Sequence, residues 1–262
     1  MQPSLFISHG SPMLLFQESE LRNFFSGLGD TLAKFNGTPR AILVMSAHWA
    51  TPSPAVGSAE MLDTIHDFYG FPQEMYEINY DPPGASHLAA RAATALSQAG
   101  IETVNDNQRG LDHGAWVPLR YMYPDAQIPV AQVSVQPHLG PTHHLALGAA
   151  LEDMRKANIL VIGSGNLTHN LGEMGQDRND GVPALWAAEF ADWVQEALVE
   201  GHLEQLVNYL SHAPNGRRAH PTEEHFLPLF LAMGAGGRGA RVERIHTSFT
   251  GGTVCNDCYS FT

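Results

Sequence analysis

Three apolar segments of this chain are each followed by a short turn and a histidine, and this repeated pattern limits its fold more than any other feature. The histidines are His9, His48 and His169. Short apolar runs bounded by Gly, Ser or Pro are typical of buried strands. In an open α/β sheet, ligands bind outside the carboxyl ends of the strands. The sequence therefore predicts a cluster of imidazoles at one edge of a sheet.

Helical patterns alternate with short apolar runs along the whole chain. Helices are expected at Glu18–Phe35, Ala85–Ala99, Thr142–Ala157, Pro183–Glu200 and Leu203–Leu210. Strands are expected at Leu5–Ser8, Ala41–Ala47, Ile101–Val104, Ile128–Val135, Asn158–Gly163, Arg241–Phe249 and Thr253–Phe261, the last two forming a hairpin around Gly251-Gly252. This alternation predicts a single α/β domain over residues 1–262, with three α/β/α layers and a central mixed sheet.

The charge balance argues against two classes of partner. The chain has 27 acidic residues and 14 Lys and Arg, a formal net charge of −13, which disfavours nucleic acid and anionic membranes as partners. No apolar stretch reaches the roughly 18 residues of a membrane helix. The first residues also lack the basic and apolar regions of a signal peptide. We therefore expect a cytoplasmic protein.

Several familiar motifs are missing or weak. The chain has no His-Glu-x-x-His zinc-protease pattern and no Gly-x-Ser-x-Gly nucleophile elbow. Gly163-Ser-Gly-Asn166 only weakly matches a phosphate-binding glycine turn. Cys255 and Cys258 have neither two further zinc ligands nor a following helix in view, so we expect ordinary reduced thiols.

Five of the fourteen histidines lie beside turns that suggest a function. They are His9, His48, His113, His169 and His225. His225 is expected early in a helix that Thr222 caps. Histidine is the commonest metal ligand and the usual acid or base at neutral pH. A histidine-rich donor set suits zinc, copper, iron or nickel better than magnesium or calcium.

A long segment, residues 51–84, interrupts the alternation and is rich in Pro, Gly and aromatic residues. It contains Ile65-His-Asp-Phe-Tyr-Gly-Phe-Pro72. Loops of this length within a domain are usually functional or disordered. The aromatic content favours an ordered loop that covers a pocket.

Six short motifs, in one order along the chain, resemble the class III extradiol ring-cleavage dioxygenases, and in particular their DOPA 4,5-dioxygenase branch. The motifs are Ser8-His-Gly-Ser-Pro12, Ser46-Ala-His-Trp49, Ile65-His-Asp-Phe68, Asp112-His-Gly114, Gly165-Asn166 with His169-Asn-Leu171, and Pro221-Thr with Glu224-His-Phe-Leu-Pro-Leu229. The resemblance extends from residue 5 to about residue 235 and so covers nearly the whole chain.

The resemblance implies a catalytic domain with a non-haem metal, normally Fe(II), although Zn(II) is also found in this branch. Carried over by position, His9, His48 and His225 would be the metal ligands. The protocatechuate branch has a glutamate as its third ligand, which makes Glu224 the alternative to His225. His169 would be the acid/base and a possible fourth ligand.

The implied reaction is cleavage of a catechol such as DOPA at the 4,5 position with O₂. His113 would contact the substrate from outside the ligand set. Trp116 would line the ring pocket, and His66 and Tyr69 would close it and meet the polar side chain of the substrate.

Two alternatives use the same histidines. A zinc hydrolase would activate a bound water, with His169 as base. A non-catalytic relative would keep only a metal pocket, although the retention of every candidate ligand and of the candidate base argues against it. Activity without O₂ distinguishes the hydrolase from the dioxygenase.

Overall fold

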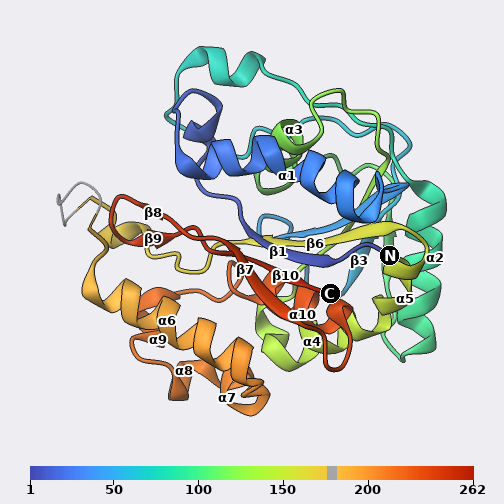
Figure 1. The fold of residues 1–262 in the computed structure, drawn as a ribbon. Coiled ribbons are helices and arrows are strands. Elements are labelled where there is room, and N and C mark those ends of the chain that lie inside the picture. The colour runs from blue at the N-terminus through green and yellow to red at the C-terminus, as the bar shows by residue number, and fades with distance from the viewer. Residues whose placement is uncertain (176–181) are drawn as a thin grey trace.

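A mixed sheet forms the centre of the molecule (Figure 1) in the computed structural model, which describes residues 1–175 and 182–262. Within these residues the sheet has eight strands in the order β4-β3-β5-β2-β6-β1-β10-β7. They are β1 (Ser4–Ser8), β2 (Ala41–Ser46), β3 (Ala55–Gly57), β4 (Val104–Asp106), β5 (Val130–Val133), β6 (Ile159–Gly165), β7 (Val242–His246) and β10 (Cys258–Phe261). Strands β5, β2, β6 and β1 are parallel, whereas β3 and β10 join them antiparallel.

The central strands are buried on both faces, as their continuous apolar sequences predict. In β1, Leu5 and Ile7 pack into one hydrophobic cluster and Phe6 into the other. In β2, Val44 and Met45 divide in the same way. The sheet therefore separates two cores, and each core needs its own layer of helices.

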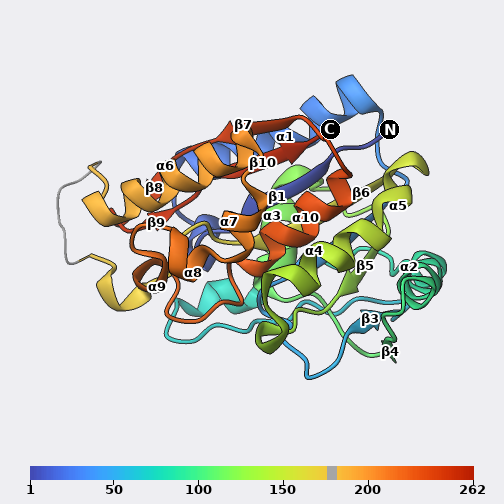
Figure 2. The ribbon, with the colours of Figure 1, turned by 90° about the horizontal axis from the view of Figure 1, so that it is seen from below.

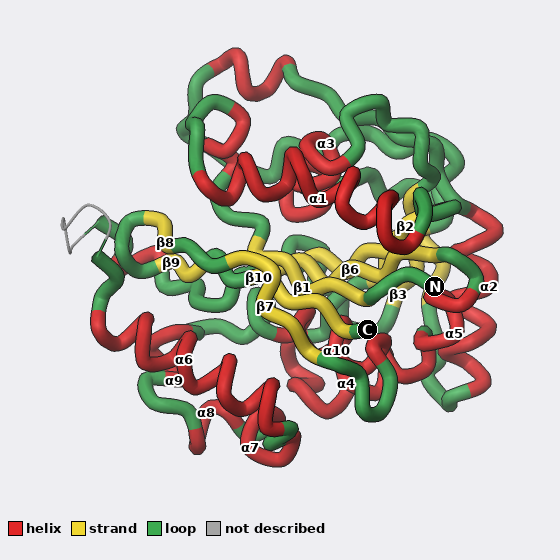
Figure 3. Tube along the Cα trace, viewed as in Figure 1, coloured by secondary structure: helices red, strands yellow, loops and turns green. Residues whose placement is uncertain are grey.

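Helices cover both faces and give three layers (Figures 1 and 3). One layer contains α1 (Glu20–Asn36) and α3 (His113–Met122). The other, seen from below in Figure 2, contains α2 (Ser86–Gln98), α4 (Gly140–Ala150), α5 (Glu152–Lys156), α6 (Leu185–Glu200), α7 (Leu203–Val207), α8 (Tyr209–His212), α9 (Gly216–Ala219) and α10 (Leu227–Gly236). No helix in the described part of the chain is both long enough and apolar enough to cross a bilayer. The predicted α/β/α layering with a mixed central sheet is confirmed.

The expected hairpin at the C-terminal end is also confirmed. Strand β10 pairs antiparallel with β7. At the turn, β8 (Phe249–Thr250) and β9 (Val254–Cys255) form a separate antiparallel pair around Gly251 and Gly252. The strands that come first and last in the sequence, β1 and β10, are neighbours in the sheet, with Ser4 opposite Phe261.

Some expected boundaries were wrong. The helix expected at Thr142–Ala157 divides at Leu151, whose N–H bonds to the carbonyl of Gly148 in a tighter turn. The strand expected at Ile101–Val104 lies further along, at Val104–Asp106. Thr222 does not cap a helix, because its hydroxyl donates to Glu224 and α10 begins only at Leu227.

Strand β6 and helix α10 approach each other closely because β6 contains glycine. A Cβ atom on Gly163 would lie 2.0 Å from the carbonyl oxygen of Pro228. Backbone in such close contact cannot move away without shifting α10 as a whole. Gly163 therefore sets the distance between the sheet and the segment that carries His225.

We expect Gly163→Ala to destabilise the protein by about 1–3 kcal/mol, the usual cost of overpacking a core. Gly27→Ala is the matched control, since Gly27 is exposed within α1 and a Cβ atom added there would meet no other atom within 4 Å. That control should be neutral or stabilising by up to about 1 kcal/mol. Urea unfolding followed by circular dichroism measures both, and equal stability of the two variants would contradict the close-contact argument.

Candidate active site

His9 follows strand β1 and His48 follows strand β2, so both lie at the carboxyl ends of the parallel strands on either side of β6. Strand β6 lies between the other two and is parallel to both. Just past the strands, the N–H of His9 donates to Gly165 (2.8 Å) and the N–H of Ala47 donates to Ser164 (2.9 Å). His9 and His48 are thus held on the two sides of the same strand end.

The third histidine comes from the segment before α10. The N–H of Asn166 donates to the carbonyl of His225 at 3.0 Å. A Cβ atom on Gly165 would lie 2.0 Å from that carbonyl oxygen. The glycines that weakly matched a phosphate-binding turn therefore have a different role here, which is to let His225 approach β6.

The three imidazoles converge through their Nε2 atoms. Nε2 of His48 lies 3.1 Å from Nε2 of His9 and 3.3 Å from Nε2 of His225. One ligand atom from each of the three residues lies within 4.8 Å of the other two. Two of these rings are almost fully buried, with His9 2% and His225 4% exposed.

An acceptor on the far side of each ring fixes its tautomer. Nδ1 of His9 lies 3.0 Å from the hydroxyl of Ser164, which itself donates to the carbonyl of Gly114 at 2.5 Å and must therefore accept from the ring. Nδ1 of His225 lies 3.0 Å from Oε1 of Glu224, and Nδ1 of His48 lies 3.3 Å from Oδ2 of Asp67.

Burial keeps the three rings neutral at pH 7. It lowers the pKa of His9 and of His225 well below the usual range. It also lowers the pKa of His48 to about 3, helped by His113 and opposed by Asp67 and Glu224. Neutral rings with protonated Nδ1 atoms leave three Nε2 lone pairs facing one another. A cation between them would relieve this repulsion, and neutral imidazole nitrogens are good ligands for divalent transition metals.

His169 lies against the third ring of this cluster. Its imidazole stacks on that of His225 with ring centroids 3.4 Å apart and planes 12° apart. Its backbone N–H donates to the carbonyl of Ala219 at 2.9 Å. Burial lowers the pKa of His169 to about 4, although Glu224 opposes the shift. The ring is therefore neutral at pH 7 and has a lone pair that can accept a proton.

His113 opens helix α3 on the opposite side of the cluster. Its ring centroid lies 4.0 Å from that of His48 and 5.4 Å from that of His9. Nδ1 of His113 lies 3.0 Å from Oδ2 of Asp67. A Cβ atom on the next residue, Gly114, would lie 3.0 Å from the His48 ring. The close approach of α3 to the cluster therefore depends on that glycine.

The structure describes the whole aromatic loop, and the residues expected to contact the substrate lie in different environments. Trp116 is fully buried in the core, where its indole N–H anchors the loop by donating to Ile65 at 3.0 Å. His66 contacts the carbonyl of Ile78 at 2.9 Å through Nε2. Tyr69 is 88% exposed at the loop surface. The ring of Phe68 instead lies 5.9 Å from that of His113, so substrate contacts by His66, Tyr69 and Trp116 stay predictions.

Sequence reasoning missed the polar residues that support the histidines. Asp112 is fully buried between the hydroxyl of Ser46 (2.5 Å) and the guanidinium of Arg109 (2.7 Å), and this links the turn after β2 to the start of α3. Burial raises the pKa of Asp112, whereas Ser46 and Arg109 oppose the shift. Both aspartates stand in quoted motifs, Asp67 in Ile65-His-Asp-Phe68 and Asp112 in Asp112-His-Gly114, but neither motif shows which group the carboxylate contacts.

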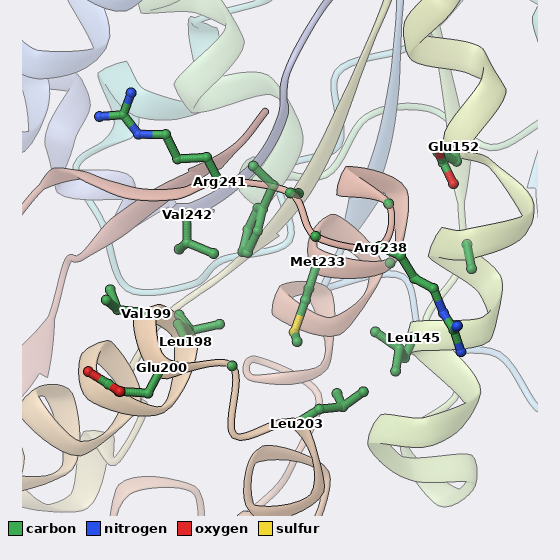
Figure 4. A pocket seen from close by; sticks show the side chains of 17 residues that line it. Leu145, Glu152, Leu198, Val199, Glu200, Leu203, Met233, Arg238, Arg241 and Val242 are labelled. Atoms are coloured by element: carbon green, nitrogen blue, oxygen red, sulfur yellow. The ribbon is translucent and has the colours of Figure 1, made fainter.

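Two other features lie apart from the cluster. Cys255 and Cys258 are buried free thiols, and burial raises the pKa of each. A cavity of about 880 Å³ lies between α4, α6 and α10 (Figure 4). Leu198, Leu203 and Met233 are among its apolar lining residues, and none of the clustered histidines lines it. The histidine cluster therefore remains the candidate active site.

Comparison with known proteins identifies the family. Residues 3–261 match the family described as the catalytic LigB subunit of aromatic ring-opening dioxygenase. The chain belongs to this family. The resemblance to extradiol ring-cleavage dioxygenases that six motifs indicated is thereby confirmed.

Individual relatives agree over most of their length. The chain is 45% identical to a 4,5-DOPA dioxygenase extradiol of Beta vulgaris, covering 100% of this chain and 97% of that relative. It is 39% identical to a protein of the same name from Escherichia coli K12, covering 89% and 84%. The crystal structure of an uncharacterized Escherichia coli K12 protein superposes with a TM-score of 0.83 at 32% identity over 100% of both chains.

If His9, His48 and His225 hold one divalent ion, His225→Ala should lower its metal content, because only two imidazoles remain. Glu224→Gln keeps an oxygen acceptor for the His225 ring and should retain the ion, with affinity reduced by about 10–100-fold. Inductively coupled plasma mass spectrometry after dialysis measures both. Full occupancy in His225→Ala with loss in Glu224→Gln would show that the glutamate is the ligand.

Proposed function

We propose that this protein is an extradiol dioxygenase that opens the ring of a DOPA-like catechol with O₂ by 4,5-cleavage. In that reaction the bond beside the diol breaks and both oxygen atoms enter the product. The observation that carries the proposal is the convergence of three neutral Nε2 atoms from His9, His48 and His225. The family membership and the 4,5-DOPA dioxygenase names of its relatives support the same reaction.

The donor set suits Fe(II) or Zn(II). We propose Fe(II) for activity, because the reaction exchanges electrons with O₂ and Zn(II) has no redox chemistry; Zn(II) would give a bound but inactive form. Held by His9, His48 and His225, either ion would supply Lewis acidity, which would favour loss of the proton from a catechol hydroxyl, as it does for water.

The protein residues around the ligands would move and hold protons. His169 is neutral and next to His225, so it can take the proton of the second catechol hydroxyl and return one during ring opening. His113, on the other side of the cluster, would hydrogen-bond to a catechol oxygen. The loop containing His66 and Tyr69, anchored through Trp116, would close over the ring and meet the polar side chain of the substrate.

Oxygen uptake by the Fe(II)-loaded protein tests the reaction directly. With a panel of catechols that vary in their side-chain amine and carboxylate, we expect one O₂ consumed per catechol and the absorbance of a ring-opened product. The matched sample is the Zn(II)-loaded protein, which should be inactive. Ester or amide hydrolysis under anaerobic conditions, without O₂ uptake on any catechol, would replace this proposal with the zinc hydrolase.

His169→Ala separates an acid/base from a ligand. We expect the variant to keep its metal and to lose turnover by roughly 10²–10⁴-fold, the range typical of acid/base groups. Metal content and kcat are measured on the same preparation. Loss of metal would place His169 among the ligands, and normal turnover with metal retained would remove it from the mechanism.

A further inference from the structure

Asp67 occupies a position that neither the ligand set nor the acid/base explains. Its Oδ2 lies 3.0 Å from Nδ1 of His113 and 3.3 Å from Nδ1 of His48. The side chain is 23% exposed and comes from the aromatic loop, not from the sheet. One carboxylate oxygen is thus shared between a candidate ligand and a candidate substrate contact.

The second oxygen of Asp67 fixes the carboxylate in place. Oδ1 accepts the backbone N–H of His113 at 2.8 Å. Helix α3 begins at His113, and the preceding Asp112 makes no side-chain cap bond. Asp67 therefore caps α3 from outside the helix, and a negative charge is favourable at this helix end. With Oδ1 held by the backbone, Oδ2 has little freedom except between the two rings.

The charge of the carboxylate selects one tautomer in both rings. A nitrogen lone pair 3.0–3.3 Å from a carboxylate oxygen is repelled, whereas an N–H group is attracted. Nδ1 of His113 lies within ion-pair distance of Oδ2 but outside hydrogen-bond geometry, so the carboxylate acts on this ring through its charge. The sign of the interaction does not depend on that geometry. Both rings consequently carry their proton on Nδ1 and keep the lone pair on Nε2.

We propose that Asp67 is a positioning residue for ring cleavage, which holds His48 and His113 in the Nδ1–H tautomer at the same time. For His48 this leaves Nε2 free to bind a metal. For His113 it leaves Nε2, and not Nδ1, available to the substrate, and a ring whose single proton is held on Nδ1 accepts a hydrogen bond from the substrate at Nε2. The sequence-based expectation had His113 as a donor from the start. The inference rests on the proposed function for its kinetic consequences only.

Asp67→Asn tests the proposal because it inverts the polarity at Oδ2 and leaves the shape unchanged. The amide oxygen can still accept the His113 N–H, so the NH₂ group faces both rings and favours the wrong tautomers. In a serine protease triad the same change lowers kcat by about 10⁴ through the wrong tautomer. Here we expect kcat to fall at least about 10–100-fold and KM to change less than about threefold.

Two comparisons separate positioning from a structural role. Asp67→Ala removes the carboxylate without opposing the tautomer, so it should retain more turnover than Asp67→Asn. A merely structural role ranks the isosteric asparagine above alanine, and that order would overturn the proposal. Asp63→Asn removes one charge from an exposed residue near the same loop and should keep wild-type kcat.

The tautomers of His48 and His113 can be measured without any catalytic reaction. In ¹⁵N-labelled protein, metal-free and Zn(II)-loaded, imidazole nitrogen shifts report which nitrogen carries the proton, with His113→Ala giving the assignment. We expect Nδ1–H at His113 in the wild type and its loss in Asp67→Asn. Unchanged tautomers in Asp67→Asn would overturn the proposal. It would also be overturned if Asp67→Asn lost metal as completely as His48→Ala, because Asp67 would then be a ligand. If the wild type cleaves no catechol, the proposed function fails while this reading still tests Asp67.

Discussion

Nε2 of His48 lies 3.1 Å from that of His9 and 3.3 Å from that of His225, and the surrounding structure must hold these neutral rings together against the repulsion of their lone pairs. The Nδ1 atom of each ring contacts a different acceptor. His9 contacts the hydroxyl of Ser164, His48 the carboxylate of Asp67, and His225 the carboxylate of Glu224. Burial lowers the pKa of all three rings, so none of them relieves the repulsion by becoming protonated at neutral pH. The protein itself thus holds the three Nε2 atoms in a convergent arrangement, and such preorganisation favours tight metal binding.

The acidic surplus of the chain is consistent with such a site. A net charge of −13 attracts cations to the protein as a whole. Near the cluster, however, the carboxylates are paired with polar groups: Asp67 and Glu224 contact Nδ1 atoms, and Asp112 is bonded to Ser46 and Arg109. Asp67 illustrates this: burial alone would raise its pKa, but His113 and His48 lower it to about 2, so it is ionised at neutral pH. The carboxylates orient the histidine rings and leave their Nε2 atoms uncharged.

The sequence predicted the parts of the fold that depend on local patterns. Strands β1, β2 and β6 are continuous apolar runs, and α1 and α2 have clear helical periodicity, so both kinds were found nearly at their true limits. The helix expected around His225 is α10, but its start was misplaced and its end was not predicted, because an all-round apolar helix has no periodicity to detect. The three-residue strand β3 lay hidden in the aromatic loop, where its pairing with β4 and β5 alone defines it.

The site divides in the same way. The sequence placed His9 and His48 at one sheet edge because each directly follows a parallel strand. The position of His225 depends on contacts across the chain, since Gly165 must lack a side chain for the segment to approach, and no local pattern shows this. Of the partners of the Nδ1 atoms, only Glu224 is adjacent in sequence to its histidine, and it was considered there as a ligand. Asp67 meets His113 across 46 residues, and only the folded loop brings them together.

The pairing of β1 with β10 has a consequence for how the chain comes to be functional. His9 stands at the end of a strand whose two neighbours, β6 and β10, arise far later in the sequence. During synthesis β1 therefore has no pairing partner on either side until β6 and then β10 have been made. Contacts this distant slow folding. A chain that lacks β10 would expose the edge of β1, so the position of His9 beside the other histidines depends on the folded C-terminal strand.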